Sequence, residues 1–172
     1  MHMETKDDDK YNMPPDMTIG DFISQYRSSN RYLVDEVTPE MRKDIILPLC
    51  LRCEEISKYF FVSYIWMSMG NTSSQIHIDT DENLLCVIHG HKKSILVSPE
   101  YSNDLYTDHG RTLGVSDINP LAVDMKKYPR VKNVRYEMAN MSEGDCLYLP
   151  QMWWHQVISP GSVRNLNTFT CS

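Results

Sequence analysis

The stretch over 74–99, SQIHIDTDENLLCVIHGHKKSILVSP, decides the fold of this chain. Its β-type runs cover 75–79, 84–89 and 93–97, and Gly90 marks the turn before the last of them. Val and Ile, which favour strands, are concentrated in these runs. The stretch therefore predicts three short strands in immediate succession, joined by turns rather than by helices.

The strand pattern extends outward over most of the chain. Further β-type runs cover 59–67, 134–139, 146–149, 153–158 and 163–170. About eight short strands without long helices between them favour an antiparallel architecture. We therefore predict a mainly β protein, a double-stranded β-helix of the jelly-roll or cupin-like kind.

Two short helices are expected to pack outside the strands. The segment 18–26 carries an apolar stripe, and the segment 39–45 follows Thr38, a good N-cap, with Pro39 at its first position. The segment 100–133 has turn signals but no strand-like run, and it is predicted to form a long excursion between strands.

Length and composition favour one globular domain. The chain has 172 residues, of which 41% are hydrophobic and 23% charged, ordinary values for a folded domain. Residues 1–16 are charged and end in two prolines, so we expect a flexible leader without the apolar core of a secretory signal, followed by a single domain over 17–172. No apolar run approaches the ~18 residues needed to cross a bilayer, so no membrane partner is expected.

The net charge and the cysteines indicate which partners and which cellular compartment to expect. The formal net charge is -6, and an acidic chain has no overall field that attracts nucleic acid, so a nucleic-acid partner is disfavoured. The five cysteines are odd in number, and no secretory signal accompanies them. Free thiols in a reducing compartment, the cytoplasm, the nucleus or both, are therefore expected.

Three residues on the predicted strands have the composition of a metal site. His77 and Asp79 are two positions apart, and alternate residues of a strand point to the same face. His155 lies on another predicted strand. Two neutral nitrogens and one carboxylate form the facial triad of non-haem Fe(II) oxygenases, which leaves coordination positions open. Taken alone, the same residues also fit a core histidine, a turn aspartate and an amphipathic barrel histidine.

A wider pattern surrounds these three residues. It consists of His77-Ile78-Asp79, Asn83, Gly90-His91-Lys92, Gly144-Asp145, Leu147-Tyr148-Leu149-Pro150 and Trp153-Trp154-His155. Over roughly 17–170 the combination resembles the JmjC domain, in its small hydroxylase branch. That branch includes the asparaginyl hydroxylase that inhibits hypoxia-inducible factor, the JmjC lysyl and arginyl hydroxylases and the tRNA wybutosine hydroxylase.

The resemblance implies a set of cofactor-binding residues. Fe(II) would be held by the triad, with 2-oxoglutarate and O2 as co-substrates and no catalytic side chain beyond the metal site. The far carboxylate of 2-oxoglutarate needs a buried charge and hydroxyl donors, and the matching residues are Lys92, Ser74 and Tyr32. Two asparagines, Asn83 and Asn167, match those that lie beside the co-substrate. In the family an aromatic pair usually follows the second asparagine, whereas Asn167 is followed by Thr168 and Phe169.

The resemblance favours hydroxylation of a side chain in a protein substrate, because the run 82–92 and the segment 120–129 look most like the lysyl hydroxylases. An N-methyl-lysine demethylase would use the same chemistry, followed by loss of formaldehyde. Hydroxylation of a tRNA base is suggested by 135–137 and opposed by the net charge. A non-catalytic cupin-like interaction protein is the alternative from another class. Several members of the family form dimers through a pair of helices that follows the region resembled here. The sequence ends at Ser172, before such a pair, so a monomer or weak dimer is expected.

Overall fold

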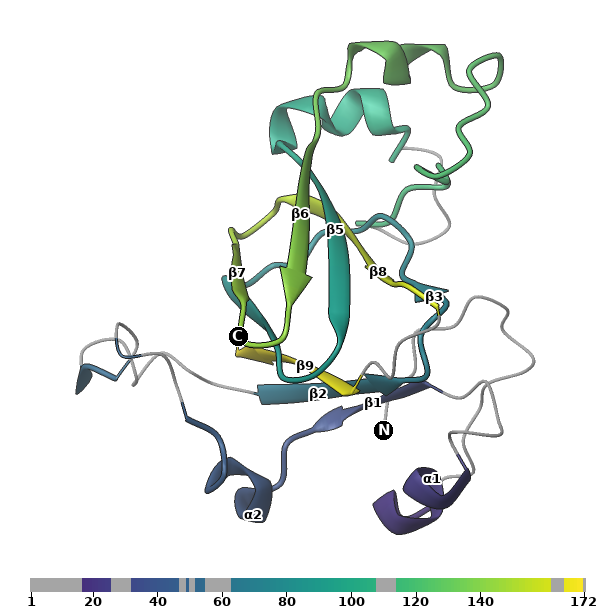
Figure 1. Ribbon diagram of the computed structural model, residues 1–172. Coiled ribbons are helices and arrows are strands. Elements are labelled where there is room, and N and C mark those ends of the chain that lie inside the picture. The colour runs from purple at the N-terminus through teal and green to yellow at the C-terminus, as the bar shows by residue number, and fades with distance from the viewer. Residues whose placement is uncertain are drawn as a thin grey trace.

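The structure, a computed structural model, describes residues 17–25, 32–46, 49, 52–54, 63–107, 114–161 and 166–171. Within these ranges the chain forms two antiparallel sheets (Figure 1). The first contains, in spatial order, β1 (Tyr32–Glu36), β2 (Ser63–Ser68), β9 (Leu166–Cys171), β4 (Asn83–Val87) and β7 (Cys146–Leu149). The second contains β3 (Thr72–Ser73), β8 (Trp154–Ser159), β5 (His91–Val97) and β6 (Glu137–Ser142). The predicted mainly β architecture is confirmed.

Most strand ends among the described residues lie within two residues of the predicted ones, with two exceptions, and the predicted starts at 59 and 163 lie outside the described residues. β7 has the predicted bounds, 146–149, whereas β6 begins and ends later than the predicted 134–139. The predicted strand over 75–79 is wrong, because His77 forms only isolated bridges, one with Val115 and one with His155. Alternation of apolar and polar residues does not reveal whether a partner strand runs alongside the whole segment.

The two predicted helices are present and short. In α1 (Ile19–Gln25), the hydroxyl of Thr18 accepts a hydrogen bond from the backbone N–H of Asp21, 3.1 Å away, which caps the first turn. The buried Phe22 fixes α1 against the first sheet by packing on Leu33 and Met67. In α2 (Pro39–Arg42), the side chain of Thr38 caps the backbone N–H of Met41, as the sequence predicts. Both helices lie on the side of β1 and β2 away from β5 and β6 (Figure 1).

The long excursion contains two 3-10 helices, η2 (Pro99–Leu105) and η3 (Pro129–Asn133). It extends from the end of β5 and returns to β6 (Figure 1). No helix in the described part of the chain has the length and apolarity needed to span a bilayer.

The second sheet separates two apolar cores because neighbouring residues on a strand face opposite sides. The inner core lies between the sheets and is formed by Leu85, Val87, Leu96, Met141 and Leu149. The outer core lies between the second sheet and the excursion and is formed by Ile76, Ile95, Val97, Leu105, Ile118 and Trp154. β5 contributes to both, and its inner face carries the polar residues of the candidate site.

The expectation of free thiols is wrong for two cysteines. Cys86 of β4 and Cys146 of β7 form a disulfide between paired positions whose Cα atoms are 4.0 Å apart. The pairing register, which no local sequence signal reveals, brings together two residues 60 positions apart. Cys53 is free and exposed, while Cys50 and the side chain of Cys171 lie outside the described residues. Cys86 and Cys146 therefore do not support the expected reducing compartment.

Candidate metal centre

The backbone places His77 and His155 directly opposite each other. The N–H of His77 donates to the carbonyl of His155 at 2.9 Å, and the N–H of His155 donates to the carbonyl of His77 at 2.8 Å. Residues paired in this way project their side chains to the same face. The two imidazole rings accordingly lie side by side, with centroids 4.3 Å apart.

Each imidazole is held in one tautomer by a backbone carbonyl. Nδ1 of His77 lies 2.9 Å from the carbonyl oxygen of Gln75, and Nδ1 of His155 lies 3.0 Å from that of Trp153. A carbonyl oxygen only accepts, so each Nδ1 carries a proton and Nε2 is the nitrogen that faces Asp79. Metal-binding histidines are oriented by this kind of contact.

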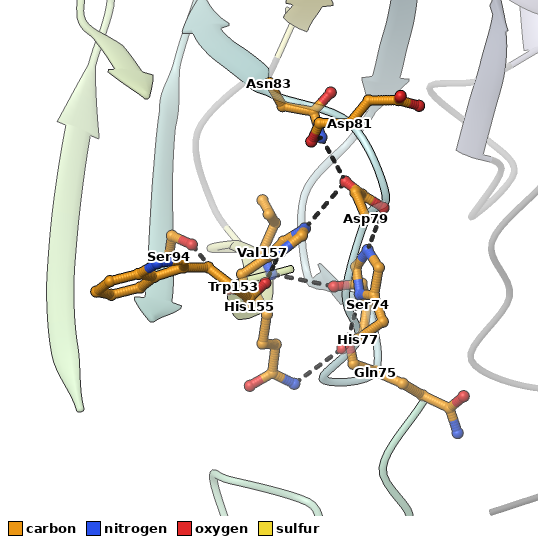
Figure 2. Close-up of polar contacts among 11 residues, drawn as sticks. Ser74, Gln75, His77, Asp79, Asp81, Asn83, Ser94, Trp153, His155 and Val157 are labelled. Atoms are coloured by element: carbon orange, nitrogen blue, oxygen red, sulfur yellow. Dashed lines mark hydrogen bonds and ion pairs between the residues drawn. The ribbon is translucent and has the colours of Figure 1, made fainter. Parts of the chain in front are cut away.

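The Asp79 carboxylate faces both Nε2 atoms (Figure 2). Its Oδ1 lies 3.8 Å from Nε2 of His77, and its Oδ2 lies 3.4 Å from Nε2 of His155. The side-chain amide of Asn83 donates to Oδ2 at 2.7 Å, and the carbonyl of Asp79 accepts from the N–H of Met152 at 2.9 Å. The carboxylate is thus fixed at both its backbone and its side chain.

Electrostatics keep the Asp79 carboxylate ionised. Burial by itself raises the pKa of this carboxyl, but the hydrogen bond with His155, the charges of His155 and His77 and the amide of Asn83 outweigh burial and leave the pKa below its usual value. A carboxylate that stays deprotonated is the form that binds a metal ion.

The three groups could together hold a metal ion. One donor atom from each of His77, Asp79 and His155 lies within 4.8 Å of the others. The side chain of His155 is 4% exposed and that of Asp79 is 42% exposed, so the centre is closed on the sheet side and open on the carboxylate side. Two imidazole nitrogens and a carboxylate oxygen suit a divalent transition metal and leave room for further ligands.

Lys92 lies on the same inner face, farther along the sheet. It is 4% exposed, and its ammonium donates to the hydroxyl of Ser159 in β8. Ser159 follows His155 by four positions on β8, which is about 13 Å along a strand. Between them lies Ser94, fully buried, whose hydroxyl donates to the carbonyl of Gln156 at 3.2 Å. The inner face therefore has a carboxylate at one end and an ammonium at the other.

Of the four remaining predicted residues, the structure describes the side chains of Ser74 and Asn83 and only the backbone of Tyr32 and Asn167. Ser74 lies beside β8, where its hydroxyl accepts from the N–H of Val157 at 3.0 Å. Asn83 contacts Asp79, as described above. The backbone of Tyr32 pairs with Ser68 in β1 and β2, and Asn167 lies in β9 opposite a register shift, but their side chains lie outside the described residues.

Sequence reasoning missed the groups that orient the predicted ones. The carbonyls of Gln75 and Trp153 each lie two positions before a histidine, and this shared spacing is the only signal that could have pointed to them. The hydroxyl of Ser159 could have been found by parity, because it lies an even number of residues after His155 on the same strand.

Comparison with known proteins places these residues in a wider context. The pattern of the cupin-like domain family matches residues 2–169. Jumonji C domain-containing protein 5 of Drosophila melanogaster is 32% identical over 123 residues, which cover 70% of this chain and 31% of that protein. Lysine-specific demethylase 8 of Xenopus tropicalis is 28% identical over 150 residues, covering 82% of this chain and 34% of that protein.

A third relative carries a different name. The tRNA wybutosine-synthesizing protein 5 of Gallus gallus is 29% identical over 158 residues, which cover 86% of this chain and 48% of that protein. The chain thus spans between about a third and a half of the length of these three relatives.

Proposed function

The chain belongs to the cupin-like JmjC family, whose members are in general Fe(II)- and 2-oxoglutarate-dependent oxygenases, and from that premise we propose that it hydroxylates a side chain of a protein substrate. The observation that carries the proposal is the convergence of two tautomer-fixed imidazoles and an ionised carboxylate on one point. Both histidines carry a proton on Nδ1, which leaves Nε2 as the nitrogen that can bind a metal.

In this proposal His77, Asp79 and His155 would hold the iron, and the carbonyls of Gln75 and Trp153 orient the two imidazoles through their Nδ1 atoms. Asn83 donates to Oδ2 of Asp79 and would hold the carboxylate in place beside the two histidines. Fe(II), when bound, supplies the coordination positions at which 2-oxoglutarate is oxidised by O2 and the substrate C–H bond is hydroxylated. The protein contributes the positioning of the reactants.

Lys92 is proposed to select the co-substrate. Its ammonium is buried on the inner face and already bonded to a hydroxyl, so a carboxylate arriving there meets a charge and a donor in a dry environment. Ser74, on the neighbouring segment, can add its own O–H while accepting from Val157. The same proposal assigns Tyr32 and Asn167 to the co-substrate by their match to the family pattern. The ammonium at one end and the triad at the other fit a dianion that chelates the metal.

Two alternative outcomes use the same centre. The name of the lysine-specific demethylase 8 relative supports removal of a methyl group from lysine, in which hydroxylation is followed by loss of formaldehyde. The name of the wybutosine-synthesizing relative supports a tRNA base as substrate, although the net charge of -6 makes a protein the favoured partner. A non-catalytic interaction protein would not need the backbone carbonyls that orient the imidazoles of His77 and His155, so these contacts favour the enzyme.

The test begins with purified protein, Fe(II), 2-oxoglutarate and O2. Formation of succinate that depends on all three co-reactants supports the oxygenase, and its absence at saturating iron contradicts it. Candidate protein partners are then incubated with the enzyme and weighed intact. A gain of one oxygen identifies a hydroxylase, whereas loss of a methylene with release of formaldehyde identifies a demethylase.

A further inference from the structure

The outer face of the second sheet contains a cavity that the proposed function does not use. It lies between the sheet and the excursion and has a volume of about 460 Å³. Its sheet side is formed by Ile76, Ile95, Val97 and Ile158, and its other side includes Ile118, Val123, Val131 and Val134. Cavities of roughly 300–1,000 Å³ with mainly apolar walls are typical of small-molecule sites.

One cation stands at this apolar cavity. Lys93 supplies the only charged side chain among the described residues that line it, and no carboxylate is among them. Lys93 is exposed although the preceding residue, Lys92, is buried. The two differ because neighbouring strand residues face opposite sides of the sheet. The cavity therefore combines an apolar interior with a solvated positive charge at its edge, a distribution that matches an amphiphile with an anionic head.

The rim is unusually apolar for a surface exposed to water. Leu121, Tyr136 and Met138 line the cavity and are 61%, 62% and 53% exposed. Exposed apolar groups gathered at one place mark binding surfaces, since covering them removes apolar area from water. Because the surface is concave, a small molecule covers it better than a flat protein face.

We propose that this cavity binds an unbranched apolar carboxylate of the medium-chain fatty acid class. The chain would lie along the wall of Ile95 and Val97, and the carboxylate would remain at the edge beside the ammonium of Lys93. The apolar contact supplies most of the affinity, because a solvated ion pair contributes little. The charge supplies the selection of an acid over an alcohol.

The proposed cavity and the metal centre share backbone but not side chains. Ile76, in the cavity wall, immediately precedes His77, and Ile158 lies on β8, which also carries His155. The sheet stands between the two sites. The inference does not depend on the proposed function, so binding rather than turnover is its readout.

The experiment is a calorimetric titration of the full chain with sodium decanoate below its micelle-forming concentration, repeated with decan-1-ol. We expect saturable binding at one site and weaker binding of the alcohol. Lys93→Gln should weaken decanoate binding about twofold to fivefold and leave decanol binding unchanged. Met138→Asp, at the exposed rim, should weaken decanoate binding about tenfold or more, because it adds a like charge and removes apolar contact.

The matched control is Ile88→Asp, which changes an exposed apolar residue, 47% accessible, that does not line the cavity. Its binding should equal that of the unchanged protein. Absence of saturable binding overturns the proposal, and so does binding that Lys93→Gln and Met138→Asp leave unaffected. Equal affinity for acid and alcohol overturns the role of Lys93. Self-association abolished by Met138→Asp, observed by sedimentation velocity, would assign the cavity to a second copy of the chain instead.

Discussion

Lys92 and Lys93 are identical side chains at adjacent positions of β5, and the two faces of the sheet give them opposite environments. Lys92 is 4% exposed and bonded to Ser159, whereas Lys93 stands in solvent at the edge of an apolar cavity. The inner face of β5 carries the hydrogen-bonded Lys92 and Ser94 beside Leu96, and the outer face carries Ile95 and Val97 beside Lys93. The difference teaches that in a two-sided strand the chemical role of a residue is set by its parity as much as by its type.

The largest expected effect is loss of the metal centre on the inner face, with the outer cavity unchanged. His155→Ala removes a metal ligand, and because loss of a group that merely orients a ligand costs about 10–100-fold in metal affinity, loss of the ligand itself should cost more. We expect no measurable turnover and no saturable binding of Fe(II) or Mn(II) by calorimetry. Decanoate binding on the outer face should persist. Full activity in this variant would contradict the metal assignment.

The second effect sharpens the contrast between the two lysines. Lys92→Ala should raise the apparent KM for 2-oxoglutarate by about two to three and a half decades, since leaving one partner of a buried ion pair alone costs ~3–5 kcal/mol. Metal binding should remain, because the triad is unchanged. The measurement is succinate formation at saturating Fe(II) and varied 2-oxoglutarate.

Two companion variants isolate the cause. Lys92→Met keeps the stem and removes the charge, so it should behave like Lys92→Ala if the ammonium matters rather than the packing. Lys93→Ala, assayed without any added fatty acid, should leave the KM for 2-oxoglutarate unchanged, as surface substitutions usually do. An equal loss in the Lys92 and Lys93 variants would contradict the assignment of the two faces.

The third effect concerns the outside of the other sheet. Replacing Cys86 and Cys146 by serine opens a link that spans 60 residues, and loss of such a link typically lowers the free energy of unfolding by about 2–4 kcal/mol. Urea denaturation under non-reducing conditions measures the change. Metal affinity of the folded protein should be unaffected, because Asn83 and Asp79 lie on the inner side. Cys53→Ser, at an exposed free thiol, is the control and should be silent.

The smallest expected effect tests how the carboxylate is held. Asn83→Ala removes the amide that donates to Oδ2 of Asp79 and should weaken metal binding about 10–100-fold without abolishing it. The measurement is calorimetry with Mn(II) at fixed pH. Asn83→Leu keeps the bulk of the side chain without its donor and should weaken binding to a similar extent. Unchanged affinity in both variants would show that Met152 alone positions Asp79.

Much of the fold could be predicted from the sequence because it follows the two-residue period of strands. The candidate metal residues were predicted from their types and spacing, although His77 and Asp79 lie on a segment that is not a strand. Neighbouring residues of a strand face opposite sides, which places Lys92 and Lys93 on different faces of β5, and the exposure of the two residues agrees. The pairing of Cys86 with Cys146 could not be predicted, since it depends on which strands become neighbours. The outer cavity could not be predicted either, because its walls come from β5 and from an excursion without a regular pattern.

The reciprocal pairing of His77 with His155 has a consequence for the kinetics of metal release. The segment that carries His77 and Asp79 is no continuous strand and is held by isolated contacts to β8, to residues 114–116, to Asn83 and to Met152. A single local opening of this segment therefore withdraws two ligands at once and leaves His155 on its strand. Dissociation of the metal should follow the opening rate of the segment, so amide hydrogen exchange at His77 should slow when metal is added and should set the upper limit for the off-rate.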